Sequence, residues 1–411
     1  MKKLLVIGYV WPEPSTTAAG CRMQQLLETF ITFGYQITFA STASKTEYCL
    51  DLGQMGISEA AIALNNPTFD VFVRELQPDV VVFDRFMVEE QFGWRVAEFA
   101  PQAIRILNTE DLHALRKARE GAIKEEVDFT LADWKNHPMT LREVASIYRC
   151  DLTLMVSTFE MGLLQELGIP KQLLLHLPLF FEAISEEATA TWPSFEERTD
   201  FVTLGNGKHA PNVDALRILK TTIWPLIREQ LPDAQLHVYG AYLPQQVNEW
   251  HDPKTGFLVH GWVEDVGRTL QQAKVLLAPL RFGAGIKGKL LDALRNGTPC
   301  VTTSIGAEGM FTNENWGGRV ADEWEKFAKD STQLYSDEKG WKKAQQEGVD
   351  SVNRLFNKEI QQNRLEERLS WLKNNLDSHR TENFMGRLLQ HQTLTSTKYM
   401  AKWIEAKNRK L

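Results

Sequence analysis

Short apolar runs alternate with amphipathic helical patterns along the first half of the chain. The apolar runs are Leu4–Val10, Gln36–Ala40, Val80–Phe83, Ile104–Leu107 and Leu152–Val156. Between the first two, the apolar residues of Cys21–Phe33 recur at helical spacing until Gly34, and Ala114–His137 is a charged, helical excursion. Strands that alternate with helices predict βαβ units and a parallel sheet.

The same rhythm begins again in the second half. Strands are predicted at Phe201–Leu204, Leu236–Tyr239, Phe257–His260, Val275–Leu280 and Val301–Thr303, with helices after Pro211, from Glu264 to Gln272 and around Leu290–Leu294. After Val320 the chain turns helical and polar. The stretch between the halves, Glu182–Asp200, is acidic and poor in large apolar residues, which is typical of a linker.

The pattern therefore predicts an α/β chain with two Rossmann-like, doubly wound domains that face a central cleft. We expect a first domain over residues 1–185, a linker over 186–200, a second domain over 201–374 and a helical tail over 375–411. Ligands of such sheets bind at the carboxyl ends of the strands. A cleft between the two domains is thus the expected site.

Composition narrows the class of protein. The 411 residues are 43% hydrophobic and 24% charged, which is typical of a soluble globular protein, and the net charge of −7 argues against a nucleic-acid partner. No apolar run approaches the ~20 residues of a membrane helix. The four cysteines lack metal-site spacing, and Trp11 and Pro12 interrupt the apolar N-terminus before it resembles a signal peptide. We expect a cytoplasmic protein.

The stretch Val275–Gly309 carries the candidate chemistry. A strand leads into a turn with three glycines, Gly283, Gly285 and Gly288, and the turn opens a short helix. Such a turn presents free backbone N–H groups and the positive end of a helix dipole, which suit a phosphate or diphosphate. Lys287 and Lys289 add cations.

Three phosphate sites fit this stretch. A dinucleotide site needs an acidic residue at the end of the next strand, near Ser304, but Glu308 lies beyond it. A nucleotide-triphosphate loop needs Ser or Thr after Lys289, where the chain has Leu290. A sugar-nucleotide site needs a cation for the diphosphate and a carboxylate for the ribose, and Lys289 and Asp292 are three residues apart on one helix face. Such a site requires no metal; the alternative is a plain surface pair.

A resemblance favours the third site. The run from Pro279 to Pro299, with Lys287, Lys289 and Asp292, resembles the donor-site signature of glycosyltransferase family 4, whose members have the GT-B fold. Thr302–Gly309 and Phe201–Asp214 resemble further parts of that family. The similarity covers most of the second half and the first half only in outline. It departs at Ala284, where the family usually has the first of two glutamates.

The resemblance implies roles for particular residues. The donor site comprises Gly205, Asn206, Lys208, Trp262, Val263, Gly283, Ala284, Gly285, Ile286, Lys287, Lys289 and Asp292. The turn residues and Lys287 would hold the diphosphate, Lys289 would support it, and Asp292 would bind the ribose. Trp262 would stack on the base, although burial in a core is the commoner place for a tryptophan.

The first domain should bind the acceptor. Thr17 and Gly20 belong to a turn of small residues that allows close approach to the backbone, and Arg22 either adds charge there or lies on the surface. Asp111 and His113 follow a predicted strand, and the resemblance implies that they face the reacting sugar as catalytic residues. The alternative for such residues is to cap a helix.

The sequence thus predicts a retaining, metal-independent glycosyltransferase without a cofactor. It would move a sugar from a nucleoside-diphosphate sugar to a saccharide or lipid-linked acceptor, in surface polysaccharide or glycoconjugate synthesis. The alternatives are a sugar-nucleotide epimerase and a catalytically silent nucleotide-sugar-binding protein. Seven Lys and Arg against three Asp and Glu in Leu376–Leu411, with an apolar stripe, predict a tail that packs on the first domain or contacts a membrane peripherally.

Overall fold

The computed structural model describes residues 2–311 and 315–408. The first domain contains a parallel seven-stranded sheet of order β3-β2-β1-β4-β5-β6-β7. Its strands are β1 (Lys2–Gly8), β2 (Tyr35–Ser41), β3 (Ser58–Ala61), β4 (Val80–Asp84), β5 (Ile104–Asn108), β6 (Leu152–Met155) and β7 (Leu174–His176). The central strand β1 aligns Val6 with Phe39 of β2 and with Val82 of β4. Val6, Phe39 and Val82 are buried, as the apolar runs predict for a sheet covered on both faces.

Helices cover both faces of this sheet. They are α1 (Ala18–Thr32), the short 3-10 turn η1 (Gly53–Met55), α2 (Thr68–Leu76), α3 (Phe86–Phe99), α4 (His113–Lys124), α5 (Leu131–Asn136), α6 (Pro138–Arg149), α7 (Thr158–Glu166) and the 3-10 turn η2 (Lys171–Leu173). Apolar residues of α2, α3, α6 and α7 share one core with the sheet. Those of α1 share the core on the opposite face.

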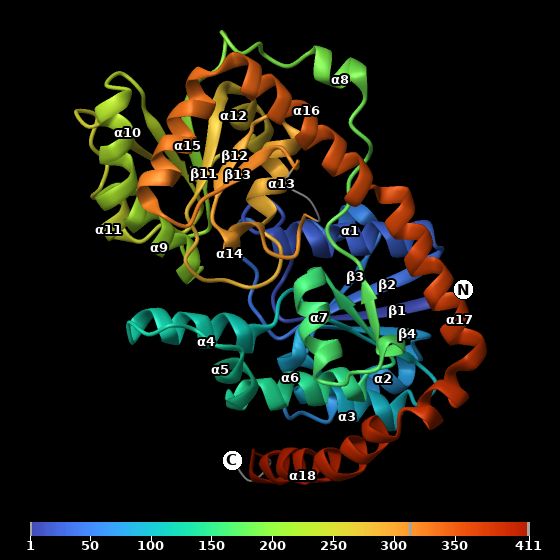
Figure 1. The fold of residues 1–411 in the computed structure, drawn as a ribbon. Coiled ribbons are helices and arrows are strands. Elements are labelled where there is room, and N and C mark those ends of the chain that lie inside the picture. The colour runs from blue at the N-terminus through green and yellow to red at the C-terminus, as the bar shows by residue number, and fades with distance from the viewer. Residues whose placement is uncertain (1, 312–314, 409–411) are drawn as a thin grey trace.

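The second domain has a parallel six-stranded sheet of order β10-β9-β8-β11-β12-β13. Its strands are β8 (Thr199–Leu204), β9 (Leu236–Tyr239), β10 (Phe257–Gly261), β11 (Ala273–Ala278), β12 (Cys300–Thr302) and β13 (Gly318–Val320). The helices are α8 (Glu186–Ala190), α9 (Ala210–Ile218), the π-helical η3 (Leu219–Ile223), α10 (Trp224–Gln230), α11 (Gln245–Asn248), α12 (Val266–Gln272), α13 (Gly288–Arg295), α14 (Ser304–Ala307), α15 (Trp324–Ser336) and α16 (Glu338–Leu355). The GT-B arrangement of two Rossmann-like domains is thus confirmed (Figure 1).

The strand order reverses between β1 and β4 in one sheet and between β8 and β11 in the other. These switch points are where open α/β sheets bind ligands. The loop after β1 leads into α1, and the loop after β11 leads into α13. Both helices therefore begin at the switch point of their own sheet.

The last two helices return to the first domain. Helix α17 (Lys358–Glu382) packs Leu365, Leu369 and Leu372 into the same core as α1. Helix α18 (Phe384–Asn408) then lies against α3 and α6, at the end of the first domain remote from the second (Figure 1). The chain thus leaves the second domain before residue 374, the predicted boundary. The prediction missed this point because the helices after Val320 are polar throughout, and a polar pattern does not show on which domain a helix packs.

Two other features differ from the prediction. The predicted linker, 186–200, contains α8 and the start of β8, and its Arg198 is fully buried and donates to the backbone carbonyl of Asn296 at 3.0 Å. The short strands β3 and β13 lack a distinct apolar run, and pairing with a neighbouring strand makes them β-structure. Strand β7 does lie in an apolar run, Leu173–Leu175, which was not predicted as a strand. In the part of the chain that the structure describes, no helix is long and apolar enough to cross a membrane.

Candidate functional site

The glycine-rich turn, Gly283–Lys287, lies where the two domains meet. Gly285 has a φ of +64°, and a Cβ atom there would lie 3.0 Å from both the Asp111 Cβ and the Glu110 carbonyl oxygen. A Cβ at Gly288 would lie 2.7 Å from the Cβ of Ala18. The N-termini of α13 and α1 therefore abut, and their positive dipole ends converge on one place between the domains.

Two lysines at the turn have lowered pKa values: Lys287, which ends the turn, and Lys289, in the first turn of α13. Lys287 is buried and donates to the Gly285 carbonyl at 2.7 Å, and Lys289 donates to the Asn212 side chain at 2.8 Å. Burial lowers the pKa of Lys287 to about 8, against the opposing charges of Glu308 and Glu160. Burial, together with Lys287, lowers the pKa of Lys289 to about 7. An anion that reached this site would stabilise both charged forms.

The alternative of a surface ion pair requires Asp292 to pair with Lys289, and the two do not pair in the structure. Asp292 lies 3.8 Å from Arg295 instead, and its side chain is 39% exposed. The protein that surrounds it nevertheless raises its pKa to about 6 by desolvation, against the charge of Arg295. Asp292 is thus an accessible carboxyl group that is partly desolvated by the protein around it. Hydroxyl groups that donate hydrogen bonds to it would stabilise its charged form.

Side chains of the first domain hold the turn, and the sequence analysis did not find them. The Gly285 N–H, expected to face a diphosphate, donates instead to Oε1 of Glu160 in α7 at 2.5 Å. Burial, then the charge of Asp111, raises the pKa of Glu160 to about 8. Arg119 of α4 donates to the Gly283 carbonyl at 2.8 Å.

Arg119 also forms a bidentate ion pair with Glu308, with distances of 2.7 and 2.8 Å. The dinucleotide hypothesis would have Glu308 bind a ribose, but in the structure its carboxylate is paired with Arg119 of the other domain. No local pattern links Arg119 or Glu160 to the turn, since each belongs to a helix of the other domain. Their partners could be found only from the folded arrangement.

Asp111 and His113 lie together on the first-domain side of this junction. Asp111 is 2.9 Å from Nδ1 of His113 and accepts from Nε of Arg116 at 2.7 Å. Burial alone would raise the pKa of Asp111, but the charges of His113 and Arg116 hold it well below its ordinary value. Burial opposes the charge of His113, yet Asp111 raises its pKa. Their mutual attraction therefore favours the ionised carboxylate and the protonated imidazole.

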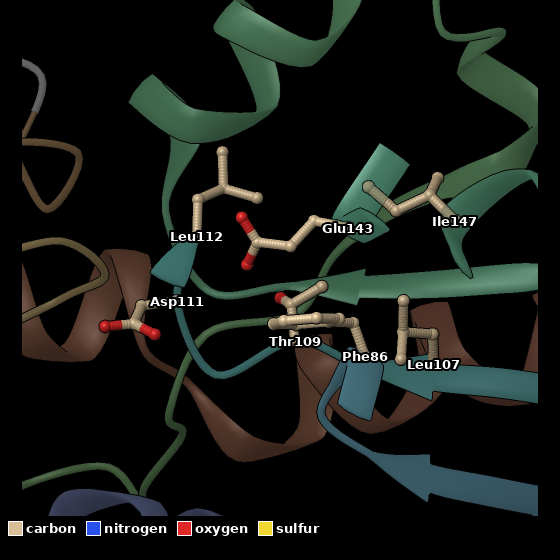
Figure 2. A pocket seen from close by; sticks show the side chains of 7 residues that line it. All are labelled: Phe86, Leu107, Thr109, Asp111, Leu112, Glu143 and Ile147. Carbon is tan, nitrogen blue, oxygen red and sulfur yellow. The ribbon is translucent and has the colours of Figure 1, made fainter. Parts of the chain in front are cut away.

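Neither residue caps α4 with its side chain. The Glu143 carboxylate of α6 does so instead, accepting from the backbone N–H groups of His113 and Ala114 at 2.7 and 2.9 Å. Burial raises the pKa of Glu143 to about 7. Figure 2 shows this carboxyl beside the Thr109–Leu112 loop, in a small hollow, with the Asp111 side chain pointing away from it. Asp111 lies instead at the domain junction, where its Cβ would be 3.0 Å from a Cβ at Gly285.

The remaining donor candidates gather on the loop after β1. Asn206 donates to the Thr16 carbonyl at 3.4 Å, and the Trp262 indole donates to the Ser15 carbonyl at 3.3 Å. Trp262 is 41% exposed, so it is not a core residue. Lys208 places Nζ 3.4 Å from the centre of the Tyr242 ring. These side chains therefore belong to the same junction as the glycine-rich turn.

Gly205 leaves room for the side chain of Asn212, which accepts from Lys289. A Cβ at position 205 would lie 2.7 Å from the Asn212 side chain and would clash with it. Val263 follows Trp262 directly and is half-buried. Ile286 packs against the second-domain core, and Ala284 is buried among first-domain core residues. The side chain at position 284 is therefore a packing residue here.

The first-domain loop residues have structural tasks. Thr17 caps α1 by accepting from the Gly20 N–H at 2.9 Å, and a Cβ at Gly20 would lie 2.3 Å from the Glu13 backbone. That close approach leaves no room for a side chain at position 20. Arg22 is fully buried, so the expectation of a surface arginine is wrong; it donates to Asn108 at 3.0 Å and to the Pro178 carbonyl at 2.9 Å.

Two doubly wound domains that meet at a glycine-rich turn are the arrangement of the GT-B fold. Residues 198–337, which make up most of the second domain, match the family model described as glycosyl transferases group 1. No curated protein matches the sequence.

Solved structures with the same fold cover nearly the whole chain. Sucrose-phosphate synthase from Thermosynechococcus elongatus is 14% identical with a TM-score of 0.65, and the match covers 90% of this chain and 99% of that one. HepE of Anabaena, in complex with UDP and glucose, is 12% identical with a TM-score of 0.65, over 90% of this chain and 100% of that one. WaaG, a glycosyltransferase involved in lipopolysaccharide biosynthesis, is 13% identical with a TM-score of 0.62, over 88% and 98%.

Proposed function

We propose that the chain is a retaining glycosyltransferase that moves a sugar from a nucleoside-diphosphate sugar to an acceptor hydroxyl in surface polysaccharide or glycoconjugate synthesis. One observation carries the proposal: two helix N-termini converge on a turn with two lysines whose pKa values are lowered by burial. Such a place stabilises added negative charge. The Anabaena relative binds UDP and UDP-glucose, so a uridine donor is the first to test.

Each group at the junction then has a task. Lys287, Lys289 and the helix N-termini neutralise the diphosphate as it departs, which lowers the barrier without a metal ion. Asp292 accepts from the ribose hydroxyls, and the exposed face of Trp262 stacks on the base. The bond from the anomeric carbon to the diphosphate breaks, and the acceptor oxygen forms the new bond on the same face. The hydroxyl proton passes to the departing diphosphate.

The first domain supplies the side that faces the sugar. Asp111 lies against Gly285, and its charge is maintained by His113 and Arg116. A carboxylate there attracts the positive charge that develops on the sugar ring in the transition state. The interdomain contacts of Glu160 and Arg119 exclude water from the turn, which protects the donor from hydrolysis.

The test is calorimetric titration with UDP-, GDP-, ADP- and TDP-linked sugars, with NAD as the comparison. We expect one sugar nucleotide to bind, and Lys287→Ala to weaken its binding at least about tenfold while leaving the melting temperature without ligand unchanged within about 2 °C. Lys254, on the far loop before β10, gives the matched control, Lys254→Ala, which should bind as the wild type does.

The outcomes separate the candidate functions. Binding of NAD alone would overturn the proposal. Sugar-nucleotide binding with conversion of one sugar nucleotide into its epimer, without an acceptor, would show an epimerase instead. Binding without either reaction across an acceptor panel would show a silent binding protein, for which the occupied N–H of Gly285 is the favouring observation.

A further inference from the structure

Helix α18 packs on the first domain through one side only. Ala401 is buried there, and Glu405 forms an ion pair with the buried Arg95 of α3. Lys398 pairs with Glu98 at 2.7 Å, and Gln390 donates to the Arg149 carbonyl at 3.1 Å. These contacts hold the helix against α3 and α6 and determine which side faces outward.

The outward side carries large apolar side chains. Their exposed fractions lie between 41% and 67%, and they are Phe384, Met385, Leu388, Tyr399, Met400 and Trp403. We call these six residues the outer face. Phe384 and Leu388, like Tyr399 and Trp403, are four residues apart, so each pair lies on one side of the helix. Apolar groups gathered in this way mark a surface that meets a partner.

The charges around the outer face are cationic. Arg387, Lys402 and Lys407 are exposed, and Nζ of Lys407 lies 5.1 Å from the centre of the Trp403 ring. Among the side chains of α18 that the structure describes, the single carboxylate is Glu405, which is turned inward to Arg95. The chain as a whole has a net charge of −7, so this cationic surface is local.

We propose that the outer face of α18 binds an anionic lipid surface, with the helix lying in the plane of the membrane interface. Tyrosine and tryptophan favour the boundary between headgroups and acyl chains, and the flanking lysines attract anionic headgroups. A symmetric dimer through the same face would bring like charges together, which disfavours a second copy as the occupant. The proposal does not depend on glycosyl transfer.

The position of α18 suits this role. The helix lies at the end of the first domain that is remote from the second domain, while the glycine-rich turn lies where the two domains meet (Figure 1). A membrane under α18 would therefore not cover the donor turn. If the acceptor is lipid-linked, binding through α18 would also bring the first domain to it.

The test is sedimentation of the full chain with vesicles of phosphatidylcholine alone, or of phosphatidylcholine with about 30% phosphatidylglycerol. We expect binding to the anionic vesicles that weakens as salt is added. The double variant Tyr399→Ser/Trp403→Ser should lose at least about tenfold in affinity. Its control is Trp371→Ser, which removes a tryptophan that is 41% exposed on α17, and this variant should bind as the wild type does.

Three results would overturn the proposal. The wild type could fail to sediment with anionic vesicles, or the double variant, shown by circular dichroism to be folded, could bind them as the wild type does. Light scattering could also show a dimer that the Trp403→Ser substitution dissociates, which would make a second copy the occupant. Equal loss of binding in Trp371→Ser would assign the effect to tryptophan content in general and contradict the role of the outer face.

Discussion

Replacing Arg119 by methionine should destabilise the protein by removing the ion pair that joins its domains. The guanidinium is 6% exposed and the Glu308 carboxylate 16% exposed, so neither is screened as a surface charge would be. Methionine keeps an unbranched apolar side chain but removes the guanidinium, whose carbon lies 5.3 Å from the centre of the Phe129 ring and 5.5 Å from that of Phe159. The substitution leaves Glu308 buried without its cation and the Gly283 carbonyl without its donor.

The expected size follows from that burial. Breaking one side of a buried ion pair costs about 3–5 kcal/mol, because the remaining charge stays desolvated. We expect Arg119→Met to lower the free energy of unfolding by about 3 kcal/mol. The double variant Arg119→Met/Glu308→Gln removes both charges, so its loss should be smaller than the sum of the two single losses by about 1–3 kcal/mol.

The assay is equilibrium unfolding in urea, followed by tryptophan fluorescence, on the ligand-free chain. The matched control is Arg142→Met, because Arg142 pairs with Glu90 at 2.6 Å but is 51% exposed. That variant should lose less than about 1 kcal/mol. A loss below about 1 kcal/mol in Arg119→Met, or strictly additive single losses, would refute the view that this pair stabilises the domain contact.

The other two predictions concern the donor. Because the pKa values of Lys289 and Lys287 are lowered to about 7 and about 8, both lysines lose charge as the pH rises through that window, so donor affinity should fall there. Donor binding at about pH 8 should be accompanied by proton uptake. Calorimetry in buffers of different ionisation enthalpy would measure that uptake, and its absence would contradict the role of the two lysines in donor binding. Trp262→Ala should weaken binding of the whole sugar nucleotide about tenfold or more but not that of inorganic diphosphate, and equal weakening of both would argue against base stacking.

Much of the fold could be predicted from local patterns. The buried strand β4 is an uninterrupted apolar run, and the helix after Gly288 shows its leucines at helical spacing. The short strands could not be found in this way. Ser58–Ala61 is largely exposed at the edge of its sheet, and it is β-structure only because Thr38–Ser41 pairs with it.

The candidate site divides along the same line. The glycine turn and the helix after it could be predicted because Gly283–Asp292 is one continuous stretch, while its role in donor binding stays a prediction. The first-domain half could not be predicted, since Glu160 is 125 residues from Gly285 and Arg119 is 164 residues from Gly283. Arg22 was misjudged for the same reason, because its burial depends on Asn108 and Pro178.

The sequence by itself determined two parallel α/β units and a glycine-rich turn that opens a helix, because apolar periodicity and glycine spacing are local properties of the chain. Tertiary structure alone decided that the turn is held across the domains by Glu160 and Arg119, and that Lys289 bonds to Asn212 rather than Asp292. It also decided which side of α18 is buried, and so which side is left outward. The physical reason is that burial and charge pairing depend on which distant segments meet, and a sequence pattern does not record those meetings.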